Sequence, residues 1–182
     1  MGREIRRVIP NWEHPRETAE TARDPRAIGK FIPLYDYDYE THLAEWIDEN
    51  SQWQRGEHPS QKGSGCKYYQ DYAGDPTDPD MCRPKWSENE ASWYQVYETV
   101  SEGTPVTPAF GTQQELIEYL VANGDFWDQK RRREGNCSMP CQPWSRDAAE
   151  NFVKELPWMP SMIITNGKIL SGSELAAFQG VQ

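Results

Sequence analysis

The spacing of apolar residues predicts amphipathic helices in the second half of the chain. Ser87 and Glu90 fit a capping box, and the apolar positions that follow have the i, i+3, i+4, i+7 spacing of one helix face: Trp93, Val96, Tyr97 and Val100. Thr112 and Glu115 form a second capping box before an apolar run that stops at Asn123-Gly124. A third helix is expected from Ser145 to Pro157. We therefore expect helices over about 87–100, 112–123 and 145–156.

The first half of the chain has one clear helix signal. Leu43, Trp46, Ile47 and Trp53 fall close to one face of a helix over about 38–55, which Gly56 ends. Four prolines spread over residues 1–34 predict an irregular N-terminal arm. Glycines and prolines also fill residues 57–86, where we expect a long loop.

Asn166-Gly167 is the only strong β-hairpin signal. Two apolar runs flank it, 161–165 and 168–170, and both turn residues tolerate a positive φ. The elements together predict an α+β fold with mostly short helices, a small β-hairpin or sheet and long irregular loops. We expect one compact domain over residues 35–182 behind the arm.

The composition changes the expected core. Ile, Leu, Val and Phe together number 28 of 182 residues, a share so low that, with a net charge of −10, it is typical of disordered chains. Eight Trp and nine Tyr favour a folded domain instead, because each of these rings buries a large area. The core is therefore expected to be rich in aromatic side chains.

The charge is concentrated in the middle of the sequence. Residues 31–128 carry five basic and nineteen acidic residues, whereas the segments before and after are each slightly basic. Such an acidic body repels nucleic acid and favours either simple solubility or a basic protein partner. The chain has no apolar run near eighteen residues and no signal-peptide pattern, so we expect no membrane span and a cytoplasmic location.

Exposed tyrosines beside acids are the predicted partner-binding residues. Tyrosine is enriched at protein interfaces, and neighbouring carboxylates would attract a basic partner. The candidates occur in two segments: Tyr35, Asp36, Tyr37, Asp38, Tyr39, Tyr68, Tyr69, Asp71, Tyr72 and Asp75. No catalytic residues are predicted, because His14, His42 and His58 lie in no recognised catalytic or metal motif. The sequence indicates a non-enzymatic protein that binds another protein, with no cofactor.

The cysteines and one basic run support an alternative. Reduced, inert thiols are the first expectation, but a disulfide or a zinc ion could instead hold the loop at 57–86. The zinc ligands would be Cys66, Cys82, Cys137 and Cys141. Lys130, Arg131, Arg132 and Arg133 could then contact phosphate, although the simpler interpretation of this run is a solvated loop. The alternative function is a zinc-supported module in DNA handling.

Several patches resemble an uncharacterised group of proteins from tailed phages and prophages. They are GREIRRV at 2–8, NWEHP at 11–15, SEGTPVTP at 101–108, RPKW at 83–86 and PSM at 160–162. None of these patches is tied to a reaction. The resemblance implies a phage accessory protein made in the bacterial cytoplasm, with a host or defence factor as a candidate target for inhibition.

Overall fold

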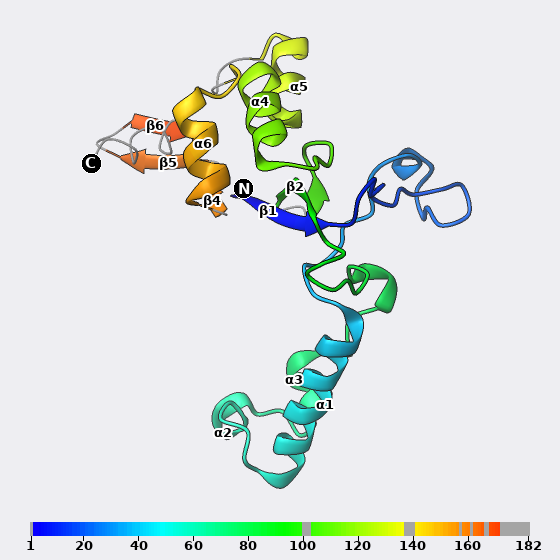
Figure 1. Cartoon of the computed structure of the whole chain (residues 1–182). Coiled ribbons are helices and arrows are strands. Elements are labelled where there is room, and N and C mark those ends of the chain that lie inside the picture. Colours follow the sequence, from blue (N-terminus) through cyan, green and yellow to red (C-terminus); the bar gives the residue numbers. More distant parts are fainter. Residues whose placement is uncertain are drawn as a thin grey trace. The chain divides into compact units, whose positions relative to one another are not determined.

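The chain forms two units that are interleaved in the sequence. The computed structural model describes residues 2–99, 103–136, 141–156, 158–160, 162–165 and 168–171, the last two ranges by their backbone (Figure 1). Leu34–Lys85 is one unit, here called the inserted unit, and Met1–Pro33 with Trp86–Gln182 is the other, here called the sheet unit. The sequence predicted a different division, an arm over 1–34 and one domain over 35–182. The α+β class is confirmed.

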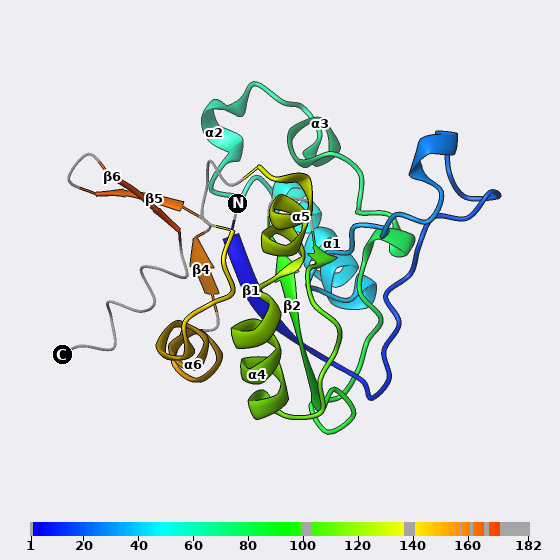
Figure 2. The ribbon, with the colours of Figure 1, turned by 90° about the horizontal axis from the view of Figure 1, so that it is seen from above.

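A four-stranded antiparallel sheet organises the sheet unit. Its order is β3 (Thr104–Pro105), β2 (Trp93–Glu98), β1 (Gly2–Val8) and β4 (Trp158–Pro160). In the long central pair Arg3 lies opposite Glu98 and Val8 lies opposite Trp93, and β4 runs along the other side of β1 (Figure 2). A separate hairpin of β5 (Met162–Thr165) and β6 (Lys168–Ser171) confirms the predicted one, and its Asn166-Gly167 turn lies outside the described residues.

Two sequence predictions about this sheet are wrong. Gly2–Val8 is a central strand and not part of an irregular arm; only residues 9–33, which contain the single-turn helix η1 (Pro25–Ala27), fit that description. The predicted helix over 87–100 is replaced by β2. The Ser87–Glu90 capping box does form, with the Ser87 amide donating to the Glu90 carboxylate at 2.9 Å, but it closes one turn only. Trp, Tyr and Val then favour a strand that is buried on both faces.

The α-helices described in the sheet unit begin at strong caps. They are α4 (Gln113–Asn123), α5 (Phe126–Glu134) and α6 (Arg146–Lys154). Thr112 and Ser145 cap α4 and α6 as predicted, and Asp125 caps α5 in a reciprocal box with Asp128. The run Lys130 to Arg133, expected as a solvated loop, lies in α5.

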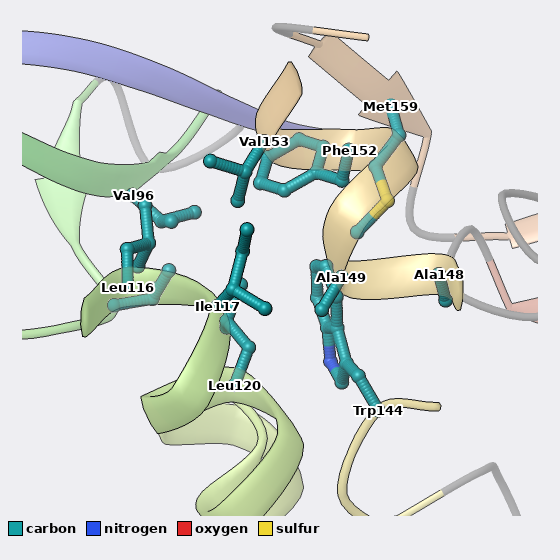
Figure 3. Packing of buried hydrophobic residues seen from close by; sticks show 11 residues of the cluster. Val96, Leu116, Ile117, Leu120, Trp144, Ala148, Ala149, Phe152, Val153 and Met159 are labelled. Carbon is teal, nitrogen blue, oxygen red and sulfur yellow. The ribbon is translucent and has the colours of Figure 1, made fainter. Parts of the chain in front are cut away.

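The hydrophobic core lies where α4 and α6 pack on one face of the sheet. Leu116, Ile117 and Leu120 from α4 face Phe152 and Val153 from α6 (Figure 3). Val96 from β2, Met159 from β4 and the indole of Trp144 complete the packing. These helices are thereby fixed by the few large aliphatic side chains that the sequence contains.

The inserted unit is helical. It contains α1 (Tyr39–Arg55), α2 (Gln61–Ser64), α3 (Tyr69–Ala73) and the single-turn helix η2 (Pro79–Met81). The predicted helix over 38–55 is confirmed, with Asp38 as its cap and Gly56 in the left-handed region at its end. The loop expected over 57–86 instead includes α2, α3 and η2, because aromatic rings described below pack there in place of aliphatic residues.

Buried ions fix β1 to α5 in the sheet unit. Arg3 is 5 % exposed, and its Nε donates to Asp125 at 2.5 Å. Its guanidinium also lies 3.8 Å from the carboxylate of Glu98, the residue opposite it on β2. The Trp127 indole donates to Glu98 at 2.8 Å, so this buried carboxylate has two polar neighbours. A strand this rich in charge is stable here because its inward charges are paired.

Asp128 extends this buried network. It accepts from the Trp144 indole at 2.9 Å and pairs with Arg131 at 2.6 Å. Burial and the negative charge of Asp125 raise the pKa of Asp128, whereas its hydrogen bonds and Arg131 favour the ionised form. The network thus joins β1, α5 and Trp144 through polar groups that are buried, except for the partly exposed Arg131.

We predict that Arg3→Met strongly destabilises the protein. Removing the guanidinium leaves buried carboxylates without their cation, which costs about 3–5 kcal/mol of unfolding free energy. Arg26→Met is the matched control, since Arg26 also pairs with an aspartate, Asp24, but is 88 % exposed. Urea unfolding should show no measurable loss for the control. Equal effects of the two substitutions would contradict a role for the buried pair.

Candidate functional site

All ten predicted partner-binding residues lie in the inserted unit. They fall into two groups, one at the ends of the unit and one on α3. The unit carries eleven acidic and five basic residues, a net charge of −6. The grouping agrees with an acidic, tyrosine-rich surface, but the two groups have different surroundings.

The first group lies where the first and last segments of the inserted unit are joined by hydrogen bonds. The Tyr35 amide donates to the carbonyl of Met81 at 2.9 Å, and the Arg83 amide donates to the carbonyl of Tyr35 at 3.2 Å. Arg83 also pairs with Asp36 at 3.3 Å. We call this region, residues 35–40 with 81–85, the end clasp.

Lys85 neutralises further acids of the end clasp. Its ammonium lies 2.9 Å from Glu40 and 3.7 Å from Asp38. Asp38 also accepts from the Thr41 amide at 3.0 Å as the cap of α1, and this hydrogen bond lowers the pKa of its carboxyl. Asp36 and Asp38, two of the acids predicted to attract a partner, are therefore engaged within the unit.

The tyrosines of the end clasp form a stack. The rings of Tyr35 and Tyr37 are nearly parallel at 5.1 Å, and Tyr37 stacks on His42 at 4.5 Å. Thr77 bridges the stack, with its hydroxyl 3.0 Å from His42 Nε2 and 3.3 Å from the Tyr37 hydroxyl. These rings pack on one another, so their first role is to hold α1 to the segment before η2.

The second group is anchored by a buried tyrosine. Tyr69 of α3 is 4 % exposed and packs against Trp46 and Trp53 of α1 and against His58. Its hydroxyl donates to the Glu49 carboxylate. Burial, together with the hydrogen bond and negative charge of Glu49, raises the pKa of Tyr69 to about 12. This ring fixes α3 on α1.

The tyrosines on either side of Tyr69 are exposed. Tyr68 is 58 % exposed and Tyr72 is 47 % exposed. Exposed acids lie close to them in the sequence: Asp71 within α3, and Asp75 directly after Gly74, the C-cap of α3, whereas Tyr68 is the N-cap. We call this set the α3 surface: Tyr68, Asp71, Tyr72 and Asp75. Of the predicted sites, it is the part that presents aromatic rings outward.

Three residues of the basic run of the alternative function, Lys130 to Arg132, make contacts within the sheet unit, and Arg133 is exposed. Arg131 pairs with Asp128, and Arg132 donates to the carbonyls of Asn123 and Cys141. Lys130 lies 5.0 Å from the Trp127 ring. Arg131, Arg132 and Arg133 occupy the last turn of α5, where their positive charges interact favourably with the helix dipole.

The cysteines do not gather in the described part of the chain. Cys66 and Cys82 are free thiols, and each sulfur donates to a different carbonyl, of Ser64 and of Asp78, at 3.7 Å. Burial and nearby aspartates raise the pKa of Cys82. Cys141 is disulfide-bonded, so the expectation of a reduced thiol is wrong there, and Cys137 lies outside the described residues. Among the described residues, no three His, Cys, Asp or Glu side chains gather as metal ligands.

The comparisons with known proteins identify no relative. No protein-family model, no curated protein and no solved structure matches this chain. Within the described ranges, no helix combines the length and apolar character needed to cross a bilayer. We therefore infer function from the arrangement of the side chains.

His14 is a buried ionisable residue that no sequence motif singled out. It lies on the sheet face opposite the hydrophobic core, 3.2 Å from the Tyr97 hydroxyl and 2.6 Å from the carbonyl of Ile32. The Tyr97 hydroxyl donates to Gln95 and accepts from the Trp12 indole. Burial lowers the pKa of His14 to about 4, against the opposing effect of the Ile32 carbonyl. The imidazole is therefore neutral in the folded protein at pH 5–7.

We predict that His14 makes the protein less stable as the pH falls from 6.5 to 4. In this range the unfolded state binds a proton that the folded state does not, so protonation favours unfolding. His14 should account for about 1 to 2 kcal/mol of lost stability between pH 7 and pH 5. His14→Gln keeps an amide donor and acceptor but cannot titrate. Urea unfolding at both pH values should show a smaller decrease for this variant; parallel decreases would contradict the prediction.

Proposed function

We propose that this protein is a non-enzymatic protein-binding module, and that the α3 surface of the inserted unit binds a basic segment of another protein. The observation that carries the proposal is the exposure of Tyr68 and Tyr72 on a helix that buried Tyr69 holds in place. A short helix would gain more stability by burying all three rings against α1. Two exposed rings on a fixed support are typical of an interface.

The rigidity of the support favours tight binding. Tyr72 stacks on Trp53 at 5.2 Å with an interplanar angle of 24°, so its ring is already oriented. A tyrosine also has few side-chain rotations to lose when a partner covers it. Binding at this surface would therefore cost little conformational entropy.

The charge of the inserted unit indicates the chemistry of the partner. A net charge of −6 on 52 residues attracts a basic surface and raises its rate of association. The acids of the end clasp are paired with Arg83 and Lys85, so this attraction comes chiefly from acids outside the clasp, which include Asp71 and Asp75 of the α3 surface. Association should weaken as salt increases.

The buried polar groups of the sheet unit support the non-enzymatic part of the proposal. Arg3, Asp125 and Asp128 pair with one another or with neighbouring helix groups, and His14 contacts Tyr97 and a carbonyl. Each has an internal structural role. The relation to phage proteins, and a host or defence factor as the partner, remain predictions that make a bacterial lysate the appropriate source of partners.

The test is to identify a partner and then to alter the α3 surface. The tagged protein is used to capture proteins from a bacterial lysate, a stoichiometric partner is purified, and its affinity is measured by calorimetry. Replacing both Tyr68 and Tyr72 by Ser should weaken binding at least about tenfold, because each ring is a candidate hot spot. Ile28→Ser is the control, since Ile28 is 50 % exposed in the sheet unit.

Two results would overturn the proposal. One is a partner whose affinity is unchanged by the double Tyr→Ser substitution. The other is an equal loss in the Ile28→Ser control, which would place the interface in the sheet unit or indicate a general loss of stability. Circular dichroism of each variant separates the latter two cases.

A further inference from the structure

The α3 surface already holds one cation of its own chain. The ammonium of Lys67 lies 4.8 Å from the centre of the Tyr68 ring, which is 58 % exposed. A cation at this distance from an aromatic face is attracted by the negative face of the ring. The face of Tyr68 is therefore able to bind a cation, and in the free protein Lys67 occupies it.

We propose that Tyr68 receives an arginine side chain of the partner, and that Lys67 competes with this arginine. The inference rests on the proposed function and specifies the chemical group recognised at the α3 surface. The Asp71 carboxylate accepts from the Tyr68 backbone amide at 3.2 Å, so a carboxylate lies close to the residue whose ring would receive the guanidinium. Arginine can stack on a ring and bind a carboxylate with the same planar group, which lysine cannot do.

Contacts elsewhere in the chain agree with a preference for arginine on these rings. In the sheet unit Arg6, Arg7 and Arg16 lie over the rings of Tyr97, Tyr94 and Phe31 at 4.5, 4.3 and 3.7 Å. The two lysines that contact rings, Lys67 and Lys130, lie farther away at 4.8 and 5.0 Å. A planar guanidinium approaches an aromatic face more closely than an ammonium and loses less hydration. An arginine from a partner would therefore displace Lys67.

The arrangement makes a prediction that simple charge attraction does not. Removing Lys67 makes the unit more acidic and also uncovers the Tyr68 face. Removing Lys62, an exposed residue of α2 in the same unit, makes the same change in charge. In the part of the chain that the structure describes, no ring contact involves Lys62. Lys62→Met is therefore a matched control for Lys67→Met.

The experiment measures binding of a fluorescently labelled nona-arginine peptide to the full chain by anisotropy at fixed salt. Lys67→Met should bind about two- to fivefold more tightly than Lys62→Met, the change expected for one exposed cation–π contact. Tyr68→Leu should weaken binding by a similar factor, whereas Tyr68→Phe should retain it. In the Tyr68→Leu background the difference between the two lysine variants should disappear. A nona-lysine peptide should respond less to Tyr68→Leu.

Equal affinities of Lys67→Met and Lys62→Met would overturn the competition, and equal responses of the two peptides to Tyr68→Leu would overturn the preference for arginine. Neither result affects the proposed function, which depends on a natural partner sensitive to Tyr68 and Tyr72. Conversely, if the arginine peptide binds at Tyr68 as expected but no natural partner is sensitive to Tyr68 and Tyr72, the inference holds and the proposed function is wrong. Because the Tyr68 backbone amide, not its side chain, bonds to Asp71, the substitutions leave the start of α3 intact.

Discussion

A shortage of aliphatic side chains constrains every part of this structure. Ile, Leu and Val supply only 23 of 182 residues, and most of those that are buried in the described part of the chain lie between α4, α6 and one face of the sheet. One compact aliphatic core is all that this composition supports. Everything outside that core must be held by aromatic rings, main-chain hydrogen bonds and paired charges.

The two faces of β1 show how polar groups replace aliphatic ones. On the core side Ile5 lies between Arg3 and Arg7; Arg3 is paired with Asp125, and Arg7 stacks on Tyr94. On the opposite face Arg6 lies over the ring of Tyr97, which also binds His14. Each charge is stable because a partner from a distant part of the sequence meets it. Removing one partner therefore costs more than the pair contributes.

The elements that could be predicted from the sequence have local causes. The helix at Tyr39–Arg55 and the helices after Thr112 and Ser145 have caps and apolar spacing that are complete within each segment. Gly2–Val8 could not be predicted, because a strand with four charged residues is stable only beside partners such as Asp125. The segment after Ser87 has a genuine capping box and a helical spacing, yet β1 and β3 pair with it and decide its conformation.

The candidate site also has features that could be predicted from local sequence and features that depend on distant contacts. Composition was sufficient to predict that the tyrosines and acids of Leu34–Lys85 lie on one surface, because these residues are common there and aliphatic residues are rare. Exposure could not be predicted, since adjacent tyrosines such as Tyr68 and Tyr69 read alike in the sequence. Which of the two is buried depends on where α3 meets Trp46 and Trp53.

The packing of α3 on α1 also determines which rings stabilise the inserted unit and which are available to a partner. Tyr72 contacts Trp53, His58 and Tyr69, so part of its exposure follows from its place at the edge of a cluster that holds the unit together. Tyr68 differs, because no ring–ring contact involves it among the described residues, and its ring lies under the ammonium of Lys67. Its aromatic face is therefore not used to build the aromatic cluster of the inserted unit. Tyr68 is therefore the residue whose chemistry most directly distinguishes a binding surface from an incomplete core.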